Sequence, residues 1–288
     1  MVITKRYAHM YFILPALVLM VSIIIVPFFF SIYITFFNVN LLEHGGAFRF
    51  AGLENYRRFF LDPRVHNAFR VTCLYIAGIL ASQTIAGIAI SMFLDRKFRF
   101  KSIYRGLIII PMFMTPVVSG LIWRTFYDPT HGISNWLLSF VGLGPVDWLG
   151  NARIALASLI LVDIWQWVPF MVLLMMASLD AIPEELREAA LAEGASEIQT
   201  VFWIKIPLIL PTILIAMIMR AIDAVKAFDI IYVMTRGGPG VSTEIMNMYA
   251  YTVGFRFFRI GYATTIAFVF TLLVTFILSK LLMKAQNI

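Results

Sequence analysis

Long apolar runs separated by polar connections dominate the pattern of this chain. Residues 11–37 and 71–94 contain no charged side chain, and neither does 106–123, although Pro111 and Pro116 interrupt that run. A helix of about 20 apolar residues crosses the roughly 30 Å hydrocarbon core of a bilayer. The first half of the chain therefore predicts three membrane-spanning helices.

Three more runs follow in the second half. The first holds one charged residue, Asp163, the second becomes charged toward its end, and the third is uncharged. Backbone polar groups in lipid must pair within their own segment, and these runs are longer than the roughly ten-residue strands of membrane barrels. We predict an all-α membrane protein in which residues 1–288 form a single transmembrane domain. Its six predicted spans cover residues 11–37, 71–94, 106–126, 154–179, 206–228 and 260–283.

The composition agrees with a lipid environment. The 288 residues are 61% hydrophobic and 14% charged, which is more apolar surface than a soluble domain of this size can bury. The net charge of +7 is scattered over loops and span ends without a basic patch, so no nucleic-acid partner is expected. Cys73 is the only cysteine and the histidines lack metal-like spacing, so no metal site is expected either.

Basic residues near the span ends predict the orientation. Short cytoplasmic loops carry an excess of Lys and Arg. Such residues crowd the connection between spans two and three and flank the outermost spans: Arg96, Lys97, Arg99, Lys101, Lys5, Arg6, Lys280 and Lys284. We expect both termini in the cytoplasm. The first span is expected to be a retained signal anchor, because its run is too long for a signal peptide and no cleavage pattern follows it.

The connection 180–205 is too long for a turn and too polar to span the membrane. Pro183 suits the first position of a helix, and Gly194 is placed to end that helix in a left-handed turn. Ser196 and Gln199 have the spacing of a capping box, which predicts a second helix directly afterwards. We name this predicted pair of helices, over 180–205, the elbow.

The charge of the elbow favours a protein partner. An interfacial helix lying on the membrane is the alternative, but such helices are generally rich in Lys and Arg. The elbow is acidic, and Ile198 and Phe202 lie four residues apart on one apolar face of its second helix. An acidic and partly apolar projection fits a socket on another protein better than anionic lipid.

The elbow also carries a recognisable motif. Glu188-Ala189-Ala190 is followed by Gly194, and Ile204 and Pro207 close the segment. This spacing resembles the EAA loop of ABC import permeases, with Ile206 in place of the usual Leu. Further segments resemble the maltose-type carbohydrate permeases: Gly52-Leu53-Glu54-Asn55-Tyr56, Pro169-Phe170, Leu179-Asp180-Ala181-Ile182-Pro183 and Thr235-Arg236-Gly237-Gly238-Pro239. Within that group, the Gly-Gly-Pro stretch followed by Thr243 resembles the first of the two permeases usually encoded together.

The resemblance implies a permease subunit of an ATP-driven importer in a bacterial inner membrane. Its implied partners are a second homologous permease, two ATPase subunits, and a periplasmic or extracellular binding protein that delivers a carbohydrate-like solute. The sequence lacks a phosphate-binding loop with the required Lys, so this chain is expected to be non-catalytic and to bind no cofactor, while the partner ATPase uses ATP and Mg. The implied ATPase-coupling residues are Glu188, Ala189, Ala190, Gly194, Ala195, Ser196, Ile198 and Phe202.

Ionisable residues inside the spans are candidates for the solute pathway, because a charge at mid-membrane is costly unless it faces protein or water. Asp163, Gln166, Trp167 and Phe170 share one face of the fourth span. Aromatic faces beside hydrogen-bonding side chains suit a sugar or polyol. The remaining candidates lie on the fifth span: Arg220, Asp223 and Lys226.

Other interpretations remain open for these charges. Asp163 could pair with Arg220, or Asp223 with Lys226, as purely structural contacts. The cations could favour an anionic solute. Asp163 and Asp223 could instead serve as ion sites of a secondary transporter, although that class predicts internal repeats with paired broken helices, and we find no such correspondence.

Overall fold

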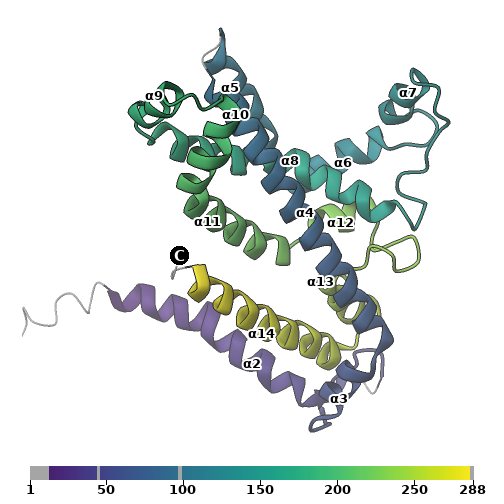
Figure 1. Ribbon diagram of the computed structural model, residues 1–288. Coiled ribbons are helices and arrows are strands. Elements are labelled where there is room, and N and C mark those ends of the chain that lie inside the picture. The colour runs from purple at the N-terminus through teal and green to yellow at the C-terminus, as the bar shows by residue number, and fades with distance from the viewer. Residues whose placement is uncertain (1–12, 44–45, 97–98, 286–288) are drawn as a thin grey trace, which may run out of the picture. The chain divides into compact units, whose positions relative to one another are not determined.

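The computed structural model describes residues 13–43, 46–96 and 99–285, and helices make up most of it (Figure 1). Two short strands, β1 (Phe37–Asn38) and β2 (Arg49–Phe50), form an antiparallel pair within these residues. The predicted all-α membrane class is confirmed. Among the described residues, five helices are long and apolar enough to cross a membrane: Ile13–Thr35, Pro63–Asp95, Ala155–Asp180, Glu197–Val225 and Ile260–Lys280.

The spans agree with five of the six predicted segments, with shifted ends. The first includes α2 (Val26–Thr35), and the second and third are α4 (Pro63–Asp95) and α8 (Ala155–Asp180). The fourth includes α11 (Ile206–Val225), and the fifth lies within α14 (Ile260–Ala285). Helix α4 begins eight residues before the predicted start, because proline fits a first helical position and the Asp62 carboxylate accepts a hydrogen bond from the Arg64 N–H at 2.9 Å. The shorter elements are α3 (Glu54–Leu61), α7 (Ile133–Ser139), α9 (Glu184–Ala192), α10 (Glu197–Thr200), α12 (Asp229–Met234) and α13 (Met246–Tyr251), with π-helical turns at Val21–Ile25, Val201–Lys205 and Thr252–Arg256.

The third predicted span, 106–126, is not one straight helix. Helix α5 (Lys101–Ile109) continues through a 3₁₀ turn at Ile110–Phe113, and α6 (Pro116–Phe126) then leaves at an angle of 98°. Pro116 disfavours helical geometry at the preceding Thr115, which is extended and caps α6 through a hydrogen bond from the Val118 N–H. The two halves count as a sixth span if they cross the membrane together.

The contacts divide the chain into two compact units, Met1–His66 with Tyr249–Leu272, and Asn67–Met248 with Leu273–Ile288. In the first unit the Asp62 carboxylate accepts hydrogen bonds from the hydroxyls of Tyr249 and Tyr262 at 2.6 and 2.7 Å. Burial raises the pKa of Asp62, but these hydrogen bonds, together with the Arg64 N–H, hold it below its usual value.

The second unit is organised around α4, α8 and α11. Helices α8 and α11 share an apolar core that includes Met171, Met175, Ile209 and Ile213. Helix α4 approaches α8 closely at Gly87, where an added Cβ would lie 2.8 Å from the Cβ of Met171. These contacts hold the three helices that carry the predicted pathway residues.

Candidate functional site

The elbow has the local structure that its sequence predicts. Helix α9 ends at Ala192, and Gly194 two residues later adopts a left-handed conformation with φ of +88°. The Ala195 N–H donates to the Ala190 carbonyl at 3.0 Å. The predicted capping box is confirmed, because the Ser196 hydroxyl accepts from the Gln199 N–H and the Gln199 side chain accepts from the Ser196 N–H. Both helix ends at the corner are therefore satisfied within the segment.

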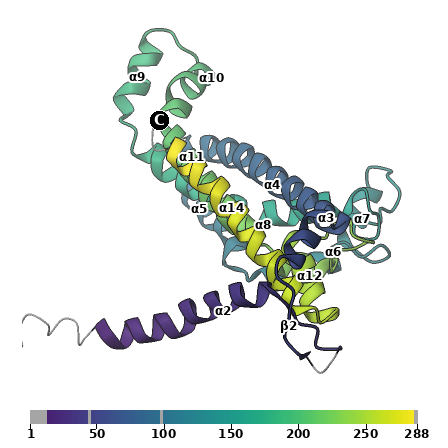
Figure 2. The same cartoon turned by 90° about the horizontal axis from the view of Figure 1, so that it is seen from below.

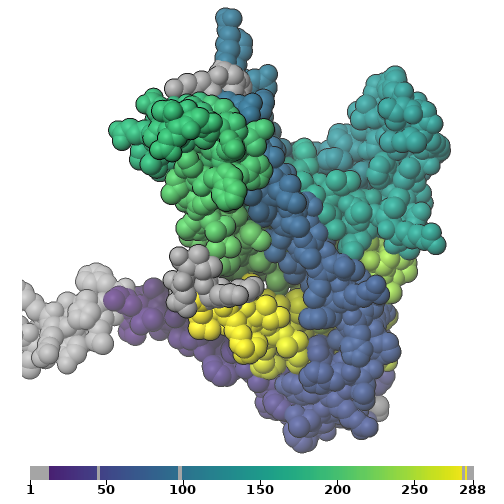
Figure 3. All heavy atoms as spheres, in the orientation of Figure 1, coloured from purple at the N-terminus to yellow at the C-terminus, as the bar shows by residue number. Residues whose placement is uncertain are grey.

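Helix α10 leads through the π-helical turn Val201–Lys205 directly into α11. Figure 2 shows α9 and α10 projecting beyond the end of α11, and in Figure 3 the green surface of residues 181–205 stands out beside the blue surface of α4. The elbow is thus a continuous extension of the fifth span.

The projecting segment exposes a large apolar face. Ile198, Phe202 and Trp203 are 67%, 63% and 77% exposed, whereas Thr200 on the opposite side is buried. Of the predicted coupling residues, Ala190 packs inside the elbow and Ala195 is half-buried. The others are exposed: Glu188, Ala189, Gly194, Ser196, Ile198 and Phe202.

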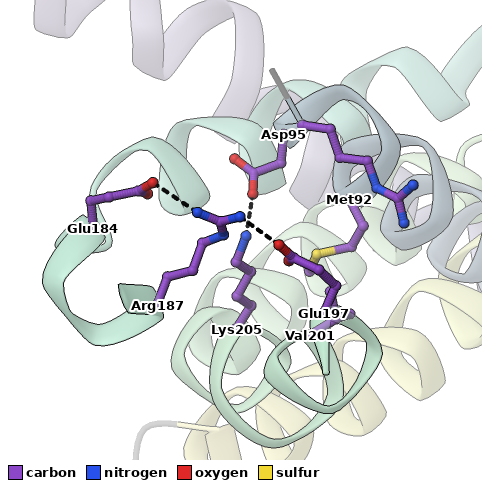
Figure 4. Close-up of a pocket in the computed structure, with 8 residues that line it drawn as sticks. Met92, Asp95, Glu184, Arg187, Glu197, Val201 and Lys205 are labelled. Atoms are coloured by element: carbon purple, nitrogen blue, oxygen red, sulfur yellow. Dashed lines mark hydrogen bonds and ion pairs between the residues drawn. The ribbon is translucent and has the colours of Figure 1, made fainter. Parts of the chain in front are cut away.

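Charged side chains line a pocket of about 500 Å³ at the base of the elbow (Figure 4). Arg187 of α9 contacts Glu184 at 3.1 Å and Glu197 of α10 at 2.5 Å. The hydrogen bond to Glu197 is the main cause of a raised pKa at Arg187. Lys205 reaches across to Asp95 at the end of α4, with 2.5 Å between Nζ and Oδ2.

A second polar cluster lies inside the spans. The Asp163 carboxylate accepts hydrogen bonds from the Tyr75 hydroxyl at 2.8 Å, from Gln83 Nε2 at 2.7 Å and from Arg220 Nη2 at 2.7 Å. Arg220 also donates from Nε to Gln83 Oε1 at 2.9 Å, and its guanidinium lies 4.7 Å from the centre of the Trp167 ring. Asp163 therefore pairs with Arg220 and links α4, α8 and α11.

The predicted pathway residues occupy three different environments. Asp163, Trp167, Arg220, Asp223 and Lys226 line one pocket of about 130 Å³, together with residues from the turn that follows α11. Asp163 and Arg220 form its buried end, since Arg220 is only 2% exposed. Asp223 and Lys226 are exposed and lie 3.7 Å apart.

Gln166 and Phe170 do not line this pocket. Gln166 is fully buried and donates from Nε2 to the Met114 carbonyl at 2.8 Å, at the break between α5 and α6. It thereby satisfies a backbone group that the broken span leaves without a helical partner. Phe170 packs against the apolar core between α8 and α11.

Sequence reasoning missed Tyr75 and Gln83. Both are uncharged polar residues within an apolar run, and each is buried in α4 against α8. A signal was available, because an amide such as Gln83 in the middle of a span needs a partner inside the protein. Which helix supplies that partner depends on how α4 is rotated, and the sequence pattern does not determine this.

Comparison with known families gives the identity of these elements. Residues 83–287 match the family described as binding-protein-dependent transport system inner membrane component. The chain belongs to this family. The matched residues include the elbow, the buried cluster from Gln83 onward, and the three spans α8, α11 and α14.

Relatives of this permease match most of its length. It is 34% identical to a probable ABC transporter permease protein of Sinorhizobium fredii, with 95% of this chain and 88% of the relative covered. It is also 34% identical to the trehalose/maltose transport system permease protein MalF of Thermococcus litoralis, covering 86% and 82%. The sulfoquinovosyl glycerol transport system permease protein SmoG of Agrobacterium fabrum is 33% identical, with 88% and 82% covered.

The fold also matches solved structures. A chain of a bacterial ABC transporter involved in the import of the acidic polysaccharide alginate superposes with a TM-score of 0.83 at 20% identity, covering 99% of this chain and 97% of that one. A second structure of the alginate transporter, in complex with a periplasmic protein bound to an alginate pentasaccharide, gives a TM-score of 0.81 at 19% identity, covering 96% and 94%. At these identities the likeness concerns the fold.

Proposed function

We propose that this permease forms half of the pathway of an ATP-driven importer for a sugar, polyol or sugar derivative. A second homologous permease supplies the other half, and this chain is the first member of that pair. Two cytoplasmic ATPase subunits hydrolyse ATP with Mg, and an external binding protein delivers the solute. The chain itself performs no chemistry and binds no cofactor.

The exposed apolar face of the elbow carries this proposal. Ile198 and Phe202 are more than 60% exposed on a segment whose corner is held by its own capping box and by the ion pair of Arg187 with Glu197. A rigid segment transmits force from a bound ATPase to α11, because α10 passes into α11 without a loop. The predicted coupling residues are therefore assigned to the ATPase contact, with Gly194 setting the angle between α9 and α10 and Ala190 packing inside the elbow.

The pocket beside the buried cluster is the proposed position of the solute. Trp167 offers an aromatic face, and the exposed Asp223 and Lys226 offer hydrogen-bonding groups, a combination that suits a polyhydroxylated ligand. The names of the trehalose/maltose and sulfoquinovosyl glycerol relatives support a carbohydrate. Asp163, Arg220, Gln166 and Phe170 act behind this surface by holding the helices in place.

The proposed location is the bacterial inner membrane, with both termini in the cytoplasm. Asp95 at the end of α4 contacts Lys205 at the base of the elbow, so the basic connection after α4 and the elbow belong to the same side. Arg96, Arg99 and Lys101 support a cytoplasmic position for that side. Lys5, Arg6 and Lys97 lie outside the described residues.

Co-purification from the native membrane tests the proposal. A tagged chain is extracted in mild detergent, its partners are identified by mass spectrometry, and ATP hydrolysis by the eluate is measured. The proposal predicts a second six-span permease, an ATPase and magnesium-dependent hydrolysis. Recovery of the chain alone, with ion-driven uptake after reconstitution, would establish a secondary transporter instead.

A further inference from the structure

The ion pairs at the base of the elbow are separate from its exposed docking face. Lys205 lies in the π-helical turn between α10 and α11, whereas Asp95 is the last residue of α4, 110 positions away in the sequence. Their side chains are only 13% and 21% exposed. This is a largely buried contact between the elbow and a helix that is not adjacent to it in the chain.

We propose that Asp95 is a positioning residue for energy coupling, whose ion pair with Lys205 ties the base of the elbow to α4. This inference rests on the proposed ATPase-driven function. Because α10 is continuous with α11, a displacement of the elbow moves the fifth span directly. The pair with Asp95 passes the same displacement to the second span, which carries Tyr75 and Gln83 of the buried cluster.

Arg187 extends the tie to the outer helix of the elbow. It contacts Glu184 within α9 and Glu197 at the start of α10, so the two elbow helices are joined by charge as well as by the Gly194 corner. A force applied to α9 is therefore carried to α10, then to Lys205, and from there to α4. Figure 4 shows Arg187 and Lys205 side by side, each directed toward an acidic partner.

The junction between the elbow and α4 depends mainly on charge. Six of the eight residues that line the pocket are charged, three of each sign, and the other two are Met92 and Val201. Since a pocket of about 500 Å³ lies between these side chains, close apolar packing does not replace the ion pairs there. Charge reversal should therefore break the junction, and a second reversal should restore it.

The test is a charge exchange in the complete transporter, reconstituted in lipid nanodiscs for distance measurements and in vesicles for uptake. The variants are Asp95→Lys, Lys205→Asp, the double exchange, and the neutral Asp95→Asn in case a reversed charge prevents folding. Nitroxide labels at Ala89 of α4 and Glu193 at the end of α9, in a Cys73→Ser background, report the elbow position by electron-electron resonance. Arg99→Asp, an exposed charge reversal in the connection after α4, is the control variant for the measured Ala89–Glu193 distance.

We expect each single variant to broaden the Ala89–Glu193 distance distribution and to lower solute uptake per ATP hydrolysed several-fold. The double exchange restores both, and Arg99→Asp leaves the distribution unchanged. A distribution that stays narrow in all single variants overturns the tie itself. A broadened distribution with unchanged uptake per ATP overturns the positioning role of Asp95 but leaves the proposed ATPase contact standing, because α10 still leads directly into α11.

Discussion

The buried pair of Asp163 and Arg220 allows a quantitative prediction. Asp163→Ala removes three side-chain hydrogen bonds and leaves the Arg220 guanidinium, 2% exposed, without its carboxylate. Removing one partner of a buried ion pair costs about 3–5 kcal/mol, because the other charge stays buried and unpaired. We expect the free energy of unfolding to fall by about that amount in Asp163→Ala and also in Arg220→Met.

The two substitutions should not be additive. Once Asp163 is absent, replacing Arg220 by the apolar Met removes the stranded charge and restores part of the stability. Contacting residues show interaction energies of roughly 0.5–3 kcal/mol, and we place this pair in the upper part of that range, because the carboxylate and the guanidinium share Gln83 as a third partner.

The assay is a double-mutant cycle in lipid–detergent micelles, with unfolding by SDS followed by circular dichroism. Asp223→Ala is the matched control, since its partner Lys226 is 71% exposed and surface pairs contribute about 0–1 kcal/mol. Losses below about 1 kcal/mol for both single variants, or strict additivity, would refute the conclusion that the pair locks α8 to α11.

Three further outcomes are expected. Gly194→Val forces a β-branched residue into φ of +88°, where an added Cβ meets no atom of the described residues within 4 Å. Backbone strain of about 1–2 kcal/mol should distort the corner, lowering uptake per ATP while the complex still assembles. Gly194→Asn should be tolerated, and normal uptake by Gly194→Val would contradict the transmission of force through the elbow. Gln166→Leu leaves the Met114 carbonyl without its hydrogen-bond donor and should lower the free energy of unfolding by about 1–3 kcal/mol in the same SDS titration. An unchanged unfolding transition would show that the break between α5 and α6 does not depend on Gln166. The pKa of Asp62 is depressed in the folded state, so the stabilisation by its carboxylate is present above the unfolded pKa near 4 and is lost as the pH falls through the folded pKa. The difference in free energy of unfolding between the unchanged protein and Asp62→Asn should therefore shrink in acid. An equal difference at pH 7 and pH 3 would contradict this.

The elbow was predictable because its structure follows local rules. The spacing of Ser196 and Gln199 specifies a capping box, and Gly194 specifies a left-handed corner, whatever the rest of the chain does. The apolar runs predicted the spans for a similar reason, since hydrocarbon thickness sets their length. Pro111 and Pro116 indicated an interruption of the third span, but no local rule gives the 98° bend.

The buried cluster could be predicted only in part. Asp163 and Arg220 were visible as costly charges in apolar runs, and their pairing was one of several open interpretations. Tyr75 and Gln83 join them because α4 presents that face to α8, which is decided by close packing at sites such as Gly87. The role of Gln166 at the break likewise depends on the fold of a segment 52 residues away.

Phe202→Asp in reconstituted vesicles tests energy coupling through the exposed face of the elbow. Solute uptake and ATP hydrolysis are measured together in vesicles that contain the permease pair, the ATPase and the binding protein, with Phe202→Leu as the conservative control. We predict that Phe202→Asp abolishes uptake and releases the ATPase from the membrane complex, whereas Phe202→Leu keeps both. Full ATP-driven uptake by Phe202→Asp would show that the ATPase does not couple through this face.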